Sequence, residues 1–284
     1  MTDTIHRFIF DTFGIRGELV KLSDSSQQMI SAHQYPPLIA KLLQQAAAVN
    51  VLLATTLKFE GKISIQLQTP GELKMLVVQS TDKLGYRGVA RYDQQADYSQ
   101  MSFKDITNNG QMCITIEPSK GQRYQGIVAL EGNDLAQCVE LYFNQSEQLK
   151  TRIWLYNNDT QVFGLLLQAL PDMLSDESFH HLVTLASTIT EQECLSVDSE
   201  TLLHRLFHQE SIINLAVDSI TFQCGCSQEK MLDSICLLNQ DEIKEILDDE
   251  GEISVTCEFC LNHFAFTEID IKKHQGFEGN SILH

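Results

Sequence analysis

Four cysteines near the C-terminus are the residues of this chain whose types and spacing could do chemistry. They form two close pairs, Cys224-Gly225-Cys226 and Cys257-Glu258-Phe259-Cys260, with 30 residues between the pairs. Thiolates are soft ligands, and four of them favour a closed, tetrahedral zinc site. The same spacing also permits one disulfide within each pair. We therefore expect a site that holds one zinc ion when reduced and loses it when oxidised.

Oxidation of such a site would change the fold around it. Zinc binding needs deprotonated thiols and contributes folding free energy to a small module directly. The acidic surroundings do not neutralise a four-thiolate centre, so its sulfurs should stay electron-rich and open to oxidants. A disulfide between two cysteines only two residues apart closes a small, strained ring. A glycine between them, Gly225, gives the backbone the conformational freedom that such a ring requires. The alternative is a permanent structural zinc site that does not switch.

Other candidate residues carry weaker signals. Four cysteines stand alone in apolar surroundings and are expected to be buried packing residues, with Cys236 the likeliest exception because it follows Cys226 by ten residues; the other three are Cys113, Cys138 and Cys194. His204 and His208 are four residues apart and could share a helix face, where solvated or packing roles are expected. His263 lies close to Cys260 and is a minor candidate for a ligand.

Several classes of enzyme are not favoured. In a thioredoxin-like oxidoreductase the Cys-x-x-Cys should open a helix, but Cys260 is followed by Leu-Asn-His-Phe-Ala-Phe, which indicates a turn and a strand. The sequence has no P-loop, no Gly-x-Gly-x-x-Gly after a strand and no Gly-x-Ser-x-Gly. We therefore expect neither ATP use nor a catalytic centre, and we expect that the protein is not an enzyme.

Acidic residues are concentrated toward the C-terminus. Residues 1–170 hold 15 Lys/Arg and 16 Asp/Glu, so this part is nearly neutral. Residues 171–223 hold 1 Lys/Arg and 9 Asp/Glu, and residues 224–284 hold 4 Lys/Arg and 13 Asp/Glu. Such a region repels nucleic acid and anionic membranes, so neither is expected as a partner. Repulsion among its like charges should also leave the folded state of this region only marginally stable unless another interaction stabilises it. The alternative is an acidic surface that merely keeps the protein soluble.

Composition indicates a soluble protein. The 284 residues are enough for one large domain or two modest ones, and 43% apolar residues can build a core. The longest apolar runs, such as Val162–Leu167, are far shorter than a membrane span. The N-terminal residues lack the basic stretch and apolar core of a signal peptide. We expect a cytoplasmic protein.

Residues 1–171 predict an α+β core domain built on a sizeable sheet. Pro36-Pro37 opens a helical pattern of apolar residues that runs to Leu53, and a second amphipathic helix is expected over Asp134–Leu149. Strands are predicted by alternation and turn signals at 63–67, Leu73–Gln79, Tyr86–Arg91, 112–116, Tyr124–Leu130, Arg152–Tyr156 and Val162–Leu170. Pro171 ends the last strand.

The rest of the chain predicts two further parts. Residues 172–223 form an acidic helical linker, expected as consecutive short helices without strands, with Asp198 capping one of them. Residues 224–284 form a small zinc-binding redox-switch domain, in which a capping box at Asn239 and a stop at Gly251 delimit one helix. A strand over Glu252–Thr256 and a hairpin partner over Phe264–Ile271 are expected. So small a module has too little core to be stable alone, which favours a metal staple.

Several segments resemble one known family. They are His6-Arg7-Phe8, Ile15-Arg16-Gly17-Glu18-Leu19-Val20, Tyr86-Arg87-Gly88-Val89-Ala90-Arg91, Arg123-Tyr124-Gln125-Gly126-Ile127-Val128, Tyr142-Phe143-Asn144-Gln145-Ser146-Glu147-Gln148-Leu149, and Phe222–Ser227 with Glu252–Cys260. Together with the two cysteine pairs, they make the whole chain similar to the redox-regulated heat-shock chaperone family (HslO, the bacterial 33 kDa heat-shock protein). One departure is Phe163-Gly164, where the family more often has paired glycines.

The resemblance implies an ATP-independent holdase that responds to oxidative stress. In the family the reduced, zinc-bound form is a largely inactive monomer, and oxidants form two disulfides, release zinc and unfold the linker. Homodimers then form and capture unfolded client proteins, which later pass to ATP-dependent foldase chaperones. Carried over to this chain, the zinc ligands and switch thiols are Cys224, Cys226, Cys257 and Cys260. The implied disulfides are Cys224–Cys226 and Cys257–Cys260.

Two other functions remain open from the residues alone. One is a thiol-disulfide oxidoreductase, which would turn over disulfide substrates when reduced. The other is a constitutive zinc-stabilised interaction module, which would keep its zinc in peroxide and bind partners without oxidation. The redox-activated chaperone is distinguished from both by a prediction about the linker. Its apolar faces, at Leu182, Leu185 and Ile189 and at Leu202 and Leu206, should be covered when reduced and exposed when oxidised.

Overall fold

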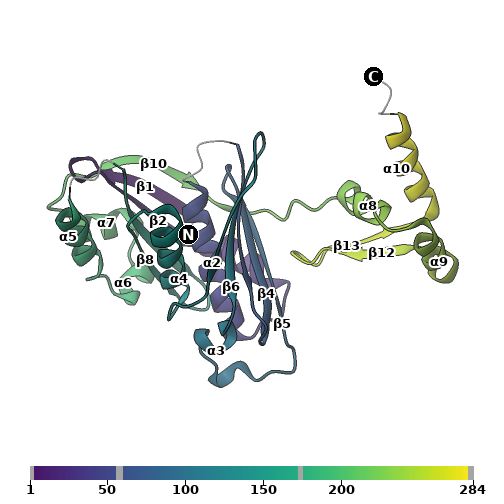
Figure 1. Cartoon of the computed structure of the whole chain (residues 1–284), viewed down its shortest axis with the longest axis horizontal. Coiled ribbons are helices and arrows are strands. Elements are labelled where there is room, and N and C mark those ends of the chain that lie inside the picture. The colour runs from purple at the N-terminus through teal and green to yellow at the C-terminus, as the bar shows by residue number, and fades with distance from the viewer. Residues whose placement is uncertain (1–2, 56–59, 172–174, 281–284) are drawn as a thin grey trace. The chain divides into compact units, whose positions relative to one another are not determined.

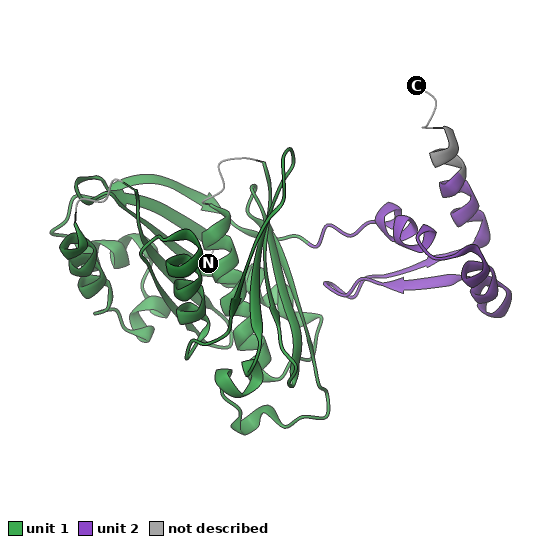
Figure 2. Cartoon of the chain, viewed as in Figure 1, with its two compact units in different colours: residues 1–223 green, residues 224–284 purple. Residues whose placement is uncertain are grey.

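The computed structural model describes residues 3–55, 60–171 and 175–280, and it divides the chain into two compact units, Met1–Gln223 and Cys224–His284 (Figures 1 and 2). For residues 276–280 only the backbone is described. Each unit has an apolar core of its own. The architecture is mixed sheets and helices, which is the α+β class expected from the sequence.

Two sheets form the frame of the first unit. One has five strands in the order β10-β1-β2-β9-β8, with the bounds β1 (Thr4–Phe10), β2 (Ile15–Leu22), β8 (Thr151–Asn157), β9 (Val162–Ala169) and β10 (Ile213–Ser219). The other has six strands in the order β11-β5-β4-β3-β6-β7, with the bounds β3 (Gly61–Gln68), β4 (Leu73–Thr81), β5 (Gly85–Tyr92), β6 (Gln111–Pro118), β7 (Tyr124–Ala129) and β11 (Thr221–Phe222). The strands expected at 112–116 and Tyr124–Leu130 pair as the hairpin β6–β7, and those expected at Arg152–Tyr156 and Val162–Leu170 pair as β8–β9.

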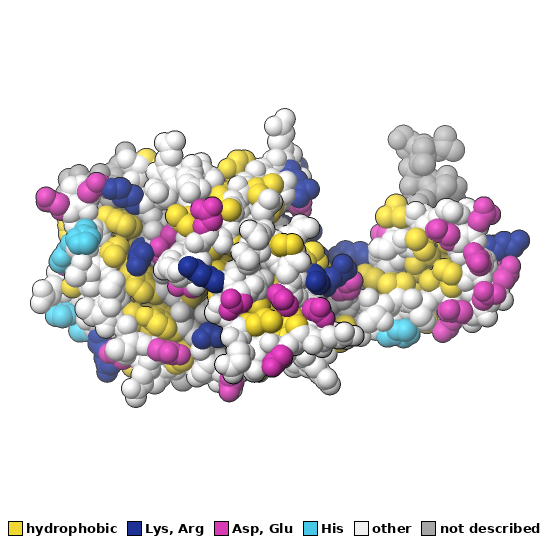
Figure 3. All heavy atoms as spheres, turned by 60° about the horizontal axis from the view of Figure 1, so that its bottom comes forward, with side chains coloured by type: hydrophobic (Ala, Val, Ile, Leu, Met, Phe, Trp, Pro, Cys, Tyr) yellow, Lys and Arg dark blue, Asp and Glu magenta, His cyan; other side chains and the backbone are white. Residues whose placement is uncertain are grey.

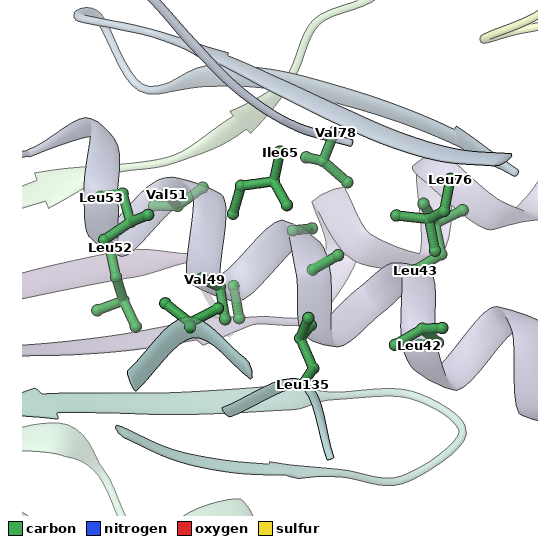
Figure 4. Packing of buried hydrophobic residues seen from close by; sticks show 14 of the residues in the cluster. Leu42, Leu43, Val49, Val51, Leu52, Leu53, Ile65, Leu76, Val78 and Leu135 are labelled. Atoms are coloured by element: carbon green, nitrogen blue, oxygen red, sulfur yellow. The ribbon is translucent and has the colours of Figure 1, made fainter. Parts of the chain in front are cut away.

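Helix α2 (Pro37–Ala54) lies between the two sheets and forms the centre of the core (Figure 4). It contacts β3, β4 and β5 of one sheet and β2, β8 and β9 of the other. Pro37 stands in its first turn, where a missing amide proton costs nothing. By length and composition α2 could cross a membrane, but 72% of its apolar window is buried inside the structure, as in the core helix of a soluble domain.

Shorter helices complete the first 171 residues. They are η1 (Asp11–Phe13), α1 (Asp24–Ser31), η2 (Tyr98–Gln100), α3 (Phe103–Thr107), α4 (Leu135–Tyr142) and η3 (Phe143–Glu147). The helix expected over Asp134–Leu149 therefore begins where predicted, with Asp134 accepting a hydrogen bond from the Gln137 backbone. It ends differently, as the π-helical turn η3, because Gln148 takes a left-handed conformation that closes it.

Three helices cover one face of the five-stranded sheet (Figure 1). They are α5 (Asp176–Ala186), α6 (Glu191–Ser196) and α7 (Ser199–Phe207). Asp198 caps α7 as predicted, by accepting a hydrogen bond from the Thr201 backbone at 2.9 Å. Of the five side chains expected to be covered, Leu182, Ile189, Leu202 and Leu206 are buried and Leu185 is half-buried. These apolar faces are therefore largely covered in this structure.

The expectation that residues 172–223 contain no strand is wrong. Strand β10 pairs with β1 along most of its length, from Thr4 opposite Ser219 to Ile9 opposite Ile213. The alternation of apolar and polar residues over Ile213–Ser219 is a strand signal. The described part of this segment belongs to the first compact unit, so its end is held by sheet pairing as well as by helix packing.

The second unit is a small α+β module. Helices α8 (Gln228–Cys236) and α9 (Gln240–Glu250) precede the hairpin of β12 (Ile253–Thr256) and β13 (His263–Phe266), and α10 (Glu268–Asn280) follows. Ser227 caps α8, Asn239 and Glu242 form the predicted capping box, and Gly251 ends α9 with a φ of 80°. Its core is five buried side chains, namely Ile235, Ile243, Ile253, Phe266 and Ile271. Acidic side chains gather on the face of this unit seen in Figure 3.

The strand expected over Phe264–Ile271 is too long. It stops at Phe266, because the Asp270 carboxylate accepts hydrogen bonds from the Thr267 backbone at 2.9 Å and from its hydroxyl at 2.6 Å. These bonds cap the first turn of α10. The sequence Thr267-Glu-Ile-Asp270 has the spacing of a helix start, and that signal decides the end of β13.

Candidate metal centre

The two cysteine pairs lie in two separate loops of the second unit. Cys224 and Cys226 directly precede α8, while Cys257 and Cys260 lie in the turn between β12 and β13. That turn is closed by two backbone hydrogen bonds, from Cys257 N–H to the Asn262 carbonyl at 2.9 Å and from Leu261 N–H to the Cys257 carbonyl at 2.8 Å. The Cys-x-x-Cys thus sits in a tight turn and does not open a helix, as expected.

The structure brings the four sulfur atoms into one cluster. All four lie within 4.8 Å of one another. Cys224 Sγ is 3.4 Å from Cys257 Sγ, and Cys226 Sγ is 3.5 Å from Cys260 Sγ. Four thiolates on a tetrahedral zinc ion would be about 3.8 Å apart, given zinc–sulfur bonds of about 2.3 Å. The donor set and its spacing therefore fit one zinc ion, and the cluster could hold a metal.

Both short sulfur contacts run between the loops. A disulfide bond has a sulfur–sulfur distance of about 2.05 Å, so neither contact is a bond, and all eight cysteines are free thiols. In this geometry, an ion held by the four sulfurs would join the start of α8 to the β12–β13 turn. Disulfides within each pair would leave the two loops without that connection.

The local environment acts differently on the individual thiols. Burial raises the pKa of Cys224 and of Cys260. Burial also opposes ionisation of Cys257, but hydrogen bonds from the backbone N–H groups of Phe259 and Cys260 and from the Cys224 thiol outweigh it and lower the pKa of that thiol. Cys257 is buried, whereas the other three cysteines of the cluster are partly exposed.

One residue at this site carries no signal in the sequence analysis. The Nζ of Lys230, in the first turn of α8, donates a hydrogen bond to the Gly225 carbonyl at 2.6 Å. Gly225 lies between the two cysteines of the first pair and has a φ of 68°. Lys230 follows Cys226 by four residues, and the Ser227 cap turns the chain so that its side chain reaches back over the loop. Only the folded geometry shows this contact.

The weaker candidates lie outside the cluster. His263 is exposed, with its Nδ1 3.3 Å from the Thr256 hydroxyl, and Cys236 is partly buried against the apolar core of the second unit. His204 and His208 do share a face of α7, with ring centroids 5.9 Å apart, and both are exposed.

Two of the lone cysteines are buried as expected. Burial raises the pKa of Cys138 to about 11 and that of Cys194 to about 12, which suits inert packing. Cys113 departs from the expectation, since it is only partly buried on the six-stranded sheet and accepts a hydrogen bond from Gln125 at 2.8 Å.

The chain is similar to proteins of one family along most of its length. The model of the family described as Hsp33 protein matches residues 3–267. The chain is 44% identical over 271 residues to the 33 kDa chaperonin of Shewanella baltica (strain OS155), covering 95% of this chain and 94% of that protein. It is 41% identical over 276 residues to the 33 kDa chaperonin of Pseudoalteromonas translucida (strain TAC 125), covering 95% and 98%.

A solved structure shares the fold. The crystal structure of the 33 kDa chaperonin (heat shock protein 33 homolog) from Thermotoga maritima superposes with a TM-score of 0.83, at 17% sequence identity, covering 99% of this chain and all of that one. The family model spans the core strands, the helices α5–α7 and both cysteine pairs. On the match along nearly its whole length and on these relatives, the chain belongs to the Hsp33 family.

Proposed function

We propose that this protein is a redox-regulated, ATP-independent molecular chaperone, a holdase that protects unfolding proteins from aggregation under oxidative stress. The observation that carries the proposal is the gathering of four reduced thiols from two loops into one cluster. The relatives named 33 kDa chaperonin support the chaperone role. The proposed parts are a core domain at 1–171, a linker at 172–223 and a redox-switch domain at 224–284.

In the reduced state, Cys224, Cys226, Cys257 and Cys260 would hold one zinc ion. Bound zinc would supply a cross-link between the two loops and favour the deprotonated form of all four thiols. The second unit needs such a link because the core formed by its described side chains contains only five buried apolar residues and its sequence is strongly acidic. In this state α5–α7 cover their apolar faces on the five-stranded sheet, and the chaperone is inactive.

Oxidation would then remove the cross-link. Within each pair, two thiolates lose two electrons to hypochlorous acid, which takes up one proton and leaves as chloride and water. The products are the disulfides Cys224–Cys226 and Cys257–Cys260, which no longer hold the ion. The second unit would lose its fold, and α5–α7 would leave the sheet.

The exposed apolar surfaces would bind unfolded client proteins and allow a homodimer to form. Clients would pass to ATP-dependent foldases once reducing conditions return. We propose that this takes place in the cytoplasm, without nucleic acid or membrane as a partner and without enzymatic turnover.

The test follows zinc and activity in one titration. Reduced, zinc-loaded protein is titrated with hypochlorite while a chromogenic chelator reports zinc release and light scattering reports aggregation of a heat-denatured client. One zinc released per chain together with a gain in anti-aggregation activity supports the proposal. Zinc retained, or released without a gain in activity, contradicts it and favours a constitutive zinc-stabilised module. Turnover of insulin disulfides by the reduced protein would favour an oxidoreductase.

A further inference from the structure

Lys230 combines two contacts with the first cysteine loop. Its Nζ donates to the Gly225 carbonyl at 2.6 Å, and its backbone N–H donates to the hydroxyl of the cap residue Ser227 at 3.3 Å. The nearest atom to a methyl group built on Gly225 would again be the Lys230 Nζ, at 3.8 Å. The ammonium group therefore lies directly over the backbone that joins Cys224 to Cys226.

Positive charge is scarce in this part of the chain. Residues 224–284 hold four lysines and no arginine against 13 acidic residues. Lys272 pairs with Glu268 at 2.5 Å on α10, and Lys244 is exposed on α9. Among the described side chains of the second unit, Lys230 is the basic one that the structure places in hydrogen-bond contact with a cysteine loop.

The contact has two physical consequences for the thiol cluster. First, the ammonium charge attracts the excess negative charge of four thiolates and makes their sulfurs less electron-rich. Second, the hydrogen bond ties down the carbonyl of Gly225, whose φ of 68° is a conformation that few residues adopt. Both effects favour the geometry in which all four sulfurs face one another, and both oppose oxidation.

We propose that Lys230 is a positioning residue that sets the oxidant threshold of this site, by holding the Cys224-Gly225-Cys226 loop in its metal-binding form and by stabilising the thiolates with its charge. This inference rests on the proposed function, because a threshold has meaning only if oxidation switches the protein. It goes beyond that proposal by naming the side chain outside the four thiols that decides how readily they react.

The test compares Lys230→Met with Lys230→Arg and Lys244→Met in the full-length, zinc-loaded protein. Methionine keeps the length and helix propensity of lysine but removes its charge. Arginine keeps the charge and the donor, and Lys244→Met removes one charge from the same unit at an exposed site away from α8. Zinc affinity is measured by chelator competition, and the rate of disulfide formation by mass spectrometry after thiol trapping in peroxide.

Weaker zinc binding and faster oxidation are expected only when the charge at position 230 is removed. Lys230→Met should bind zinc roughly three- to tenfold more weakly and oxidise faster by a similar factor, as expected for loss of one nearby charge in a high dielectric. Lys230→Arg and Lys244→Met should stay within about twofold of the parent, and the Lys230→Met effect should shrink in about 1 M salt. A merely structural role for the lysine stem would not give this salt dependence.

Two results would overturn the inference. One is Lys230→Met with the zinc affinity and oxidation rate of the parent, and the other is an equal change in Lys244→Met. If Lys230→Met does not refold with zinc, Lys230→Gln takes its place, and parental behaviour of that variant rules out a role for the charge. The parent protein is also tested for anti-aggregation activity after hypochlorite treatment, and this keeps the two proposals apart, since its failure to gain that activity would count only against the proposed function.

Discussion

The ring of Phe207 in α7 packs edge-on against the ring of Phe10 in β1, with centroids 5.0 Å apart and planes at 75°. Phe8 lies beside both rings, with centroids 6.2 Å from Phe207 and 5.6 Å from Phe10. All three side chains are at most 1% exposed. This aromatic contact attaches α7 to β1. Helix α7 belongs to the segment that we propose leaves the sheet on oxidation.

Replacing Phe207 with alanine should loosen that segment without oxidation. Loss of a fully buried phenylalanine costs about 3–5 kcal/mol of packing. Reduced, zinc-loaded Phe207→Ala should therefore show faster hydrogen exchange in α5–α7 and part of the anti-aggregation activity that the parent shows only after oxidation. The matched control is His208→Ala, at an exposed position next in the chain, which should behave like the parent. Unchanged exchange in Phe207→Ala would mean that this contact does not hold the segment.

Removing one thiol of the cluster should abolish tight zinc binding. Cys257 is the most buried of the four, and its sulfur lies 3.4 Å from that of Cys224. Cys257→Ser should lose stoichiometric zinc and with it the fold of the second unit, as measured by metal analysis and circular dichroism after reduction. Cys236→Ser removes a thiol of the same unit outside the cluster and should retain one zinc per chain. Tight zinc in Cys257→Ser would show that the four-thiol site is wrong.

Gly225 should matter through its backbone alone. A Cβ there would meet only the Lys230 Nζ, in ordinary van der Waals contact at 3.8 Å, but the φ of 68° is unfavourable for a side chain. Gly225→Ala should weaken zinc binding by roughly five- to thirtyfold, corresponding to about 1–2 kcal/mol for a left-handed residue. Gly225→Asn should lose less, since asparagine tolerates this region better. Chelator competition measures the zinc affinities of the parent and of the two variants. Equal affinities of these three proteins would show that the loop does not need a left-handed residue at this position.

Acid should weaken the fold of the first unit through His6. This residue lies in β1 and lines a cavity of about 390 Å³ with Lys21, Cys194, Asp198 and Glu200. Burial lowers the pKa of His6, and Lys21 lowers it further, against the opposing effect of Glu200 and Asp198. The folded unit therefore binds fewer protons at His6 than the unfolded chain, so its stability is fully present above the ordinary value of about 6.5 and is lost as pH falls from there through the lowered pKa.

The contribution of His6 to the pH dependence can be isolated by comparing the parent with a variant that lacks the imidazole. Between about pH 7.5 and 5.5, hydrogen exchange in β1 and its neighbours β2 and β10 should accelerate more in the parent than in His6→Asn, because asparagine does not titrate. Other groups that titrate in this range contribute equally to both proteins. The same acceleration in both would assign the pH dependence to those other groups.

Local signals predicted the parts of the structure that depend on neighbouring residues. The cap at Asp198, the capping box at Asn239 and the stop at Gly251 all come from contacts within a few residues. Proline at the start of α2 and the alternation in β3 and β6 are signals of the same kind. The order of strands in the two sheets has no such local origin.

The features that the sequence analysis missed depend on a distant partner, on a local signal that was outweighed, or on a contact that needs the folded turn. Strand β10 follows three helices and pairs with β1, more than 200 residues earlier in the chain, so its short alternation was outweighed by the helical pattern around it. The early end of β13 follows from the Thr267–Asp270 cap, a local signal that competed with an apolar run. The contact of Lys230 with Gly225 needs the turn at Ser227 before it can exist.

The central claim is that oxidation at the cysteine cluster releases α5–α7 from the core sheet. Hydrogen exchange with mass spectrometry on the full-length protein, reduced with zinc and then after hypochlorite treatment, tests it most directly. We expect strong protection of α5–α7 in the reduced protein, loss of this protection and of that of the second unit after oxidation, and unchanged protection of α2. Equal protection of α5–α7 in both states would show that oxidation does not release these helices.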